Sequence, residues 1–244
     1  MKKNSVIFFL LFYPKIIFGT VDSVFFKANT FYKEGNYQEA LFLYDSLINT
    51  NIISGELLYN IGNTYYKINK LGYSRYYYEK ALYYMPFDND LITNLNFLLS
   101  KIPGDFGFGI PSLIERVQNF LRFSNWKFIF ILFSFLILVL FIIKFWQYLN
   151  NRLSENIVKS ILYVILSFVS TFLFTVLNDE QKNRYAIVAE SVLTKNEPFE
   201  SSVDLFKLNE GTKVILFETD GDYVKIKLPD GKTGWVRQNA LLHL

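Results

Sequence analysis

The chain has 244 residues and a formal net charge of +3 at pH 7, with no cysteine and a single histidine. The lack of cysteine excludes disulfides, thiol catalysis and cysteine metal ligands, and His243 has no neighbours at a metal-binding spacing. The basic excess lies at the N-terminus and beside two apolar segments, as membrane topology requires, rather than on a folded domain that would bind nucleic acid. We therefore expect neither a metal nor a nucleic-acid partner.

Residues 1–23 have the pattern of an export signal. A basic head, Met1-Lys2-Lys3, precedes an apolar body that Pro14 and Lys15 interrupt. Gly19 and Ser23 offer small residues for cleavage. The alternative is an uncleaved N-terminal anchor, and both interpretations place the following residues outside the cytoplasm.

Residues 24–101 contain an internal period of 34 residues. This is the period of tetratricopeptide repeats, in which each unit is a pair of antiparallel helices. We predict two repeats and a capping helix near residues 90–101, with small side chains where helices approach closely. The pairs aligned by the shift include Phe25/Tyr59, Ala28/Gly62, Asn29/Asn63, Phe31/Tyr65, Tyr32/Tyr66, Lys33/Lys67, Ala40/Ser74 and Tyr44/Tyr78.

The first helices of such repeats line a concave surface. Asparagine can bind an extended peptide backbone through a donor and an acceptor, and lysine can bind a carboxylate. We predict a protein- or peptide-binding groove there, away from the helix contacts, with Glu79 on the convex side. The alternative is an ordinary solvated surface. The predicted groove residues are Phe25, Asn29, Tyr32, Lys33, Tyr59, Asn63, Tyr66 and Lys67.

Residues 102–125 are predicted to form a linker and a juxtamembrane amphipathic helix, which Ser112 and Glu115 begin as a capping box. Residues 126–149 and 157–177 are predicted transmembrane helices, and Ser134 is the only polar residue between 128 and 143. Their short basic connection is expected in the cytoplasm, which returns the C-terminus to the side of the repeats.

Residues 184–244 alternate apolar and polar side chains between Asp-Gly turns, which predicts a small all-β barrel. The segment from Asp230 to Val236, with Gly-Trp-Val after an Asp-Gly turn, resembles bacterial SH3 domains. Members of that family bind peptides or cell-wall components. Tyr223 and Trp235 are candidates for an aromatic ligand shelf, or for packing within the barrel.

The predicted fold class is thus a multidomain membrane protein: an all-α repeat module, a two-helix transmembrane hairpin and an SH3-like barrel. This order, with the segment Gly72–Leu82, resembles the BatE-type proteins of bacterial aerotolerance operons. The resemblance implies residence in the bacterial inner membrane, with the soluble domains on the periplasmic side. It also implies work with membrane-anchored von Willebrand A-domain proteins and a MoxR-type ATPase.

We expect a non-enzymatic scaffold without cofactors or catalytic residues, because no Ser/His/Asp set is present. The alternative is a cell-wall sensor whose SH3-like domain binds peptidoglycan. Deleting residues 184–244 would abolish the function of a sensor and only weaken that of a scaffold.

Overall fold

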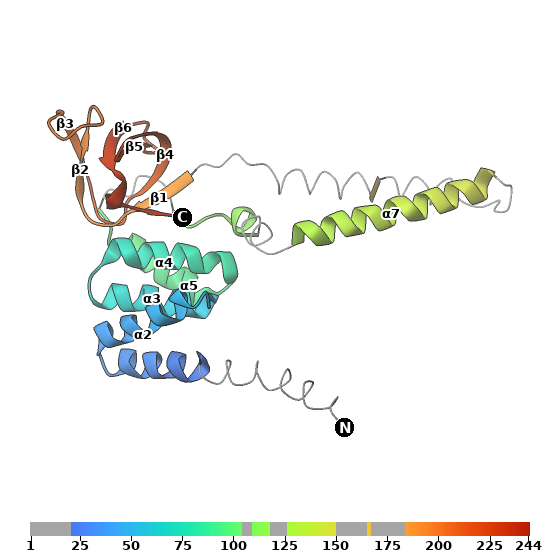
Figure 1. Ribbon diagram of the computed structural model, residues 1–244, viewed down its shortest axis with the longest axis horizontal. Coiled ribbons are helices and arrows are strands. Elements are labelled where there is room, and N and C mark those ends of the chain that lie inside the picture. Colours follow the sequence, from blue (N-terminus) through green and yellow to red (C-terminus); the bar gives the residue numbers. More distant parts are fainter. Residues whose placement is uncertain (1–20, 104–108, 118–125, 150–164, 167–183) are drawn as a thin grey trace, which may run out of the picture. The chain divides into compact units, whose positions relative to one another are not determined.

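The computed structural model describes residues 21–103, 109–117, 126–149, 165–166 and 184–244 (Figure 1). These residues belong to two compact units. One unit combines the chain up to Ile110 with the segment from Asn183 to Leu244, and the other lies between Pro111 and Lys182.

The first unit begins with a repeat-like module of helix pairs, which confirms the predicted all-α character of this region. Turn residues at the helix junctions adopt positive φ values, as at Gly35 (+84°) and Asn69 (+59°). The side chain of Ser54 caps one helix by accepting from the Leu57 N–H at 3.1 Å. The helices are residues 21–33, α2 (Tyr37–Asn49), α3 (Gly55–Lys67), α4 (Leu71–Tyr84) and α5 (Asn89–Leu99).

The predicted close helix contacts are present. Ala28, Ala40 and Ser74 are completely buried, and the Ser74 hydroxyl donates to the Gly62 carbonyl at 2.8 Å. A Cβ atom at Gly62 would lie 2.6 Å from the Tyr78 ring. The 34-residue alignment therefore identified the positions where two helices leave no room for a larger side chain.

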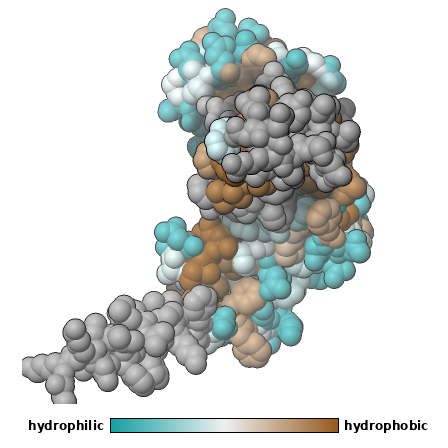
Figure 2. Space-filling view, turned by 90° about the vertical axis from the view of Figure 1, so that its right-hand side faces the viewer, coloured by the Kyte–Doolittle hydropathy of each residue, from teal (hydrophilic) through white to brown (hydrophobic). Residues whose placement is uncertain are grey.

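The same unit ends with an antiparallel all-β domain, as predicted, whose strands form one seven-stranded sheet of order β3-β2-β6-β5-β4-β1-β7 among the described residues. Its core contains Val214, Ile226 and Val236 from the alternating strands. Hydrophilic residues predominate at the end of this domain that points away from the helices, at the top of Figure 2. The strands are β1 (Arg184–Val188), β2 (Val192–Lys195), β3 (Asp204–Leu208), β4 (Lys213–Asp220), β5 (Tyr223–Lys227), β6 (Thr233–Arg237) and β7 (Leu241–His243).

Helix α4 packs against this β domain through buried charges. Glu79 is 6% exposed and accepts from Arg75 of its own helix at 2.9 Å, while Lys213 of β4 donates to its other oxygen. The Arg75 guanidinium also donates to the Gly211 carbonyl at 2.8 Å. Glu79 was predicted on the convex side, away from the groove, but this side of α4 is not a free surface, because the β domain covers it.

In the second unit, a short helix over residues 113–117 begins with the predicted capping box. The Glu115 N–H donates to the Ser112 hydroxyl at 3.2 Å, and the Ser112 N–H donates to the Glu115 carboxylate at 2.7 Å. Helix α7 (Trp126–Leu149) occupies the position of the first predicted span.

Across the described residues, no helix combines the length and the apolar character that crossing a membrane requires. Of the second predicted span, 157–177, only residues 165–166 are described, and these two are helical. The predicted signal over residues 1–23 also lies outside the described residues, apart from its last three positions.

Candidate functional site

An asparagine in the first repeat joins three helices through its carbonyl oxygen. Oδ1 of Asn29 accepts from the Tyr44 hydroxyl of α2 at 2.6 Å and from the Asn60 amide of α3 at 3.0 Å. Asn29 lies in the helix over residues 21–33, so its side chain holds that helix to both neighbours.

The same arrangement recurs 34 residues later. Oδ1 of Asn63 in α3 accepts from the Tyr78 hydroxyl of α4 at 2.6 Å and from the Asn94 amide of α5 at 3.1 Å. We call these two sets of hydrogen bonds the Asn–Tyr ladder. Asn29 and Asn63 were predicted to lie away from helix contacts, whereas their oxygen atoms make such contacts.

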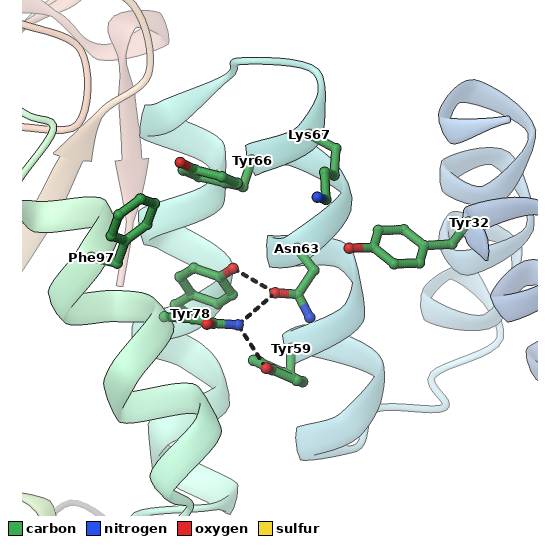
Figure 3. Close-up of a pocket in the computed structure, with 8 residues that line it drawn as sticks. Tyr32, Tyr59, Asn63, Tyr66, Lys67, Tyr78 and Phe97 are labelled. Atoms are coloured by element: carbon green, nitrogen blue, oxygen red, sulfur yellow. Dashed lines mark hydrogen bonds between the residues drawn. The ribbon is translucent and has the colours of Figure 1, made fainter. Parts of the chain in front are cut away.

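The second rung of the ladder borders a cavity of about 380 Å³ (Figure 3). Helix α3 presents four side chains to it, because residues spaced by three, four, seven or eight positions share one helical face. The neighbouring helices supply the remaining walls. The lining residues are Tyr32, Tyr59, Asn63, Tyr66, Lys67, Tyr78, Asn94 and Phe97.

Three donor groups converge on the space between α3 and the helix of residues 21–33. Figure 3 shows the Asn63 amide nitrogen, the Lys67 ammonium and the Tyr32 hydroxyl pointing into it. Because Asn63 Oδ1 already accepts two hydrogen bonds, the orientation of this amide is determined and its NH₂ group faces the cavity.

Two phenols at the cavity, Tyr32 and Tyr78, have a raised pKa and are therefore neutral donors at pH 7. Burial, followed by the nearby Tyr37 and Tyr59, raises the pKa of Tyr32 above its ordinary value. Burial also raises the pKa of Tyr78, and the neighbouring Tyr59 adds to the shift. The cavity therefore offers neutral O–H and N–H donors beside one ammonium, a set that suits a carboxylate or a peptide carbonyl.

Five of the eight predicted groove residues line this cavity: Tyr32, Tyr59, Asn63, Tyr66 and Lys67. The other three do not.

Phe25 packs against Tyr44, with ring centroids 6.1 Å apart. Asn29 is engaged in the ladder, and Lys33 is exposed. Of the predicted groove residues that line the cavity, the first repeat therefore supplies one and the second repeat supplies four.

Three lining residues were missed by the sequence analysis: Tyr78, Asn94 and Phe97. The 34-residue alignment could have identified two of them. Tyr78 aligns with Tyr44 and Asn94 aligns with Asn60 at the same 34-residue shift. Phe97 has no such counterpart in the first repeat, so its position follows from the packing of α5 alone.

The two aromatic candidates in the β domain are largely covered. Tyr223 and Trp235 are each 8% exposed. The Tyr223 hydroxyl donates to the Glu200 carboxylate at 2.8 Å, and Arg237 donates to the same oxygen at 2.6 Å. The Lys225 ammonium lies 5.6 Å from the centre of the Trp235 ring. This burial favours the packing role of the two rings over a ligand shelf.

Among the described residues, no group of three or more His, Cys, Asp or Glu side chains could hold a metal ion. In the comparisons with known proteins, no family model matches the chain, and no curated protein is significantly similar to it. The cavity and the sequence patterns are therefore the observations from which a function can be inferred.

Proposed function

We propose that the chain is a non-enzymatic adaptor whose helical module, of the tetratricopeptide type, binds an extended segment of a partner protein in the cavity beside α3. One observation carries this proposal: the Asn63 NH₂ group faces the cavity beside the ammonium of Lys67. A donor held in place by the ladder loses little conformational freedom when a ligand binds.

The cavity has the size and composition of a side-chain or chain-end pocket. Its volume of about 380 Å³ falls in the range of small-ligand sites, which combine apolar walls with a few polar groups. Tyr59, Tyr66 and Phe97 provide the walls. The donors of Asn63 and Lys67 would then bind a carbonyl or carboxylate of the bound segment.

We further propose that the protein works at the periplasmic face of a bacterial inner membrane. Support for this setting comes from sequence alone: the signal pattern of residues 1–23, the apolar segments 126–149 and 157–177, and the resemblance to BatE-type proteins. Under this proposal the partners are von Willebrand A-domain membrane proteins of a MoxR-associated system. The resemblance of the β domain to bacterial SH3 barrels belongs to the same proposal.

The burial of Tyr223 and Trp235 favours the helical module over the β domain as the ligand-binding part. A peptidoglycan sensor acting through an aromatic shelf would need these rings accessible. The scaffold is therefore the function that we carry forward, ahead of the cell-wall sensor.

Site-specific photo-crosslinking in intact cells tests the adaptor. A photoreactive phenylalanine analogue replaces Phe97, which is 53% exposed at the cavity. We expect a discrete crosslinked partner. Its yield should fall about tenfold with Asn63→Asp and Lys67→Gln combined, because each lost hydrogen bond is worth about 0.5–1.5 kcal/mol.

Lys33→Gln is the matched control, since Lys33 occupies the equivalent position of the first repeat and does not line the cavity. Its yield should equal that of the unsubstituted chain. Equal yields in all three backgrounds, or no discrete partner at all, would remove the basis for the proposal.

A further inference from the structure

A second cavity, of about 570 Å³, lies beside α2, α3 and α4. It shares no lining residue with the cavity beside Asn63. Its walls combine aromatic rings, aliphatic side chains, two carboxylates and one lysine. The lining residues are Gln38, Leu41, Phe42, Asp45, Tyr65, Ile68, Lys70, Tyr73 and Glu190.

The carboxylate of Asp45 forms no ion pair with the lysine that lines this cavity. It is half-buried, and among the described residues it makes neither an ion pair nor a hydrogen bond. Burial raises the pKa of this carboxyl above its ordinary value. The one lysine that lines the cavity, Lys70, pairs with Glu190 at 2.6 Å. The cavity thus keeps one carboxylate whose hydration is reduced and whose charge is not matched.

The aromatic side chains form a rigid surface next to this carboxylate. The Tyr65 ring stacks on Tyr73, with centroids 5.0 Å apart, and on Tyr77, with centroids 5.5 Å apart. Phe42, in contrast, is 75% exposed. A cation is attracted to the face of an aromatic ring as well as to a carboxylate, and both attractions strengthen where water is partly excluded.

We propose that this cavity binds a basic side chain, an arginine or lysine, presented by a partner protein. The charge of Asp45 selects the cation, and Phe42 with the stacked tyrosines holds the apolar part of the side chain. Arginine suits the cavity best, because its planar guanidinium both stacks on rings and bonds a carboxylate with two parallel donors. This site is independent of the groove proposed above.

The test uses the full-length protein and two probes, N-acetyl-arginine amide and its uncharged isostere N-acetyl-citrulline amide. Binding is followed by ligand-detected NMR in a titration at low salt. We expect the arginine probe to bind with a dissociation constant in the millimolar range, as suits one ion pair and one cation–π contact. The citrulline probe should bind at least threefold more weakly.

Two variants and a control localise the binding. Asp45→Asn should weaken the arginine probe roughly three- to tenfold, and Phe42→Ala should weaken it without unfolding the chain, since that ring is mostly exposed. Asp90→Asn makes the same chemical change at an exposed residue of α5 outside the cavity, and should change nothing. Equal binding of the two probes, an unaltered affinity in Asp45→Asn, or no binding of the arginine probe would overturn the proposal.

Discussion

Glu79 of α4 and Lys213 of β4 lie 134 residues apart in the chain and form a buried ion pair. Arg75 donates to the second oxygen of the same carboxylate at 2.9 Å, so both oxygens have charged partners. Separating a buried carboxylate from its cations is costly, because each charge would be left buried without its partner. The pair therefore joins the helical module to the β domain.

This ion pair predicts that the stability of the contact depends on pH. Burial opposes ionisation of Glu79, but Lys213 and Arg75 outweigh it and lower the pKa of the carboxyl below its ordinary value of 4.5. A group with a lowered pKa in the folded state contributes stability above its unfolded pKa and loses it as the pH falls through the folded value. We expect the melting temperature to fall as the pH decreases below about 4.5.

The variant Glu79→Gln tests whether Glu79 causes this loss of stability at low pH. It removes the carboxylate charge that faces two buried cations, so at pH 7 it should destabilise the protein by about 3–5 kcal/mol. The difference between the variant and the unsubstituted chain should then shrink below pH 4.5, as Glu79 takes up a proton. A difference that stays constant down to pH 3 in calorimetric scans would contradict the assignment.

Gly72 provides a second test of the same contact. Its N–H donates to the Glu210 carboxylate at 3.0 Å, and a Cβ atom there would lie 2.6 Å from the Ala189 carbonyl oxygen. Since backbone atoms cannot move aside as side chains do, Gly72→Ala should separate α4 from the β domain at a cost of about 1–3 kcal/mol.

The measurement for Gly72→Ala is limited proteolysis followed by mass spectrometry, with cleavage expected between the two domains. Gly109→Ala serves as the control, because no atom lies within 4 Å of the added Cβ and the residue has no positive φ. If both variants resist the protease equally, the close approach at Gly72 does not limit the contact.

The 34-residue period predicted the interior of the helical module well. It identified Gly62 and Ser74 as close contacts, because a repeat places equivalent residues in equivalent surroundings. It also marked Asn63 and Lys67, but it did not show that Asn63 binds Tyr78 through its oxygen. Periodicity places a residue on a face of a helix and does not say which atoms of the side chain are already used.

The environment of Glu79 could not be predicted from the sequence. Its partner Lys213 belongs to another domain, and no local pattern relates two residues so far apart. An isolated glutamate on a helix is usually solvated, so placing Glu79 on the convex side gave no reason to expect its burial. Packing of α4 against the β domain, which is distant in the sequence, buries Glu79 instead.

The proposed membrane setting makes a prediction about topology. An exported N-terminus followed by two spans puts Lys101 and Leu244 on the same, periplasmic side. Alkaline phosphatase fused at either position should be active in cells, and β-galactosidase fused at the same positions should be inactive. If β-galactosidase were active and alkaline phosphatase inactive at both positions, the periplasmic setting would be excluded. If the two positions differed from each other, the two-span hairpin would be excluded.

Asn63 allows stability to be separated from binding. Asn63→Ala removes the acceptor of the Tyr78 hydroxyl and of the Asn94 amide. Because the Tyr78 side chain is only 2% exposed, its hydroxyl would lose this acceptor where water cannot easily replace it, at a cost of about 1–3 kcal/mol. We therefore expect a clear fall in melting temperature by circular dichroism.

Asn63→Asp keeps the accepting oxygen and replaces only the NH₂ group that faces the cavity. The ladder should survive, and the melting temperature should stay near that of the unsubstituted chain. Binding of an anionic or carbonyl-bearing segment should nevertheless weaken several-fold, because a donor has become an acceptor beside Lys67. Asn29→Asp makes the same exchange in the first rung, outside the cavity, and should preserve binding. If Asn63→Asp instead binds as well as Asn29→Asp does, the cavity-facing amide is only a structural group, and its oxygen accounts for its whole role.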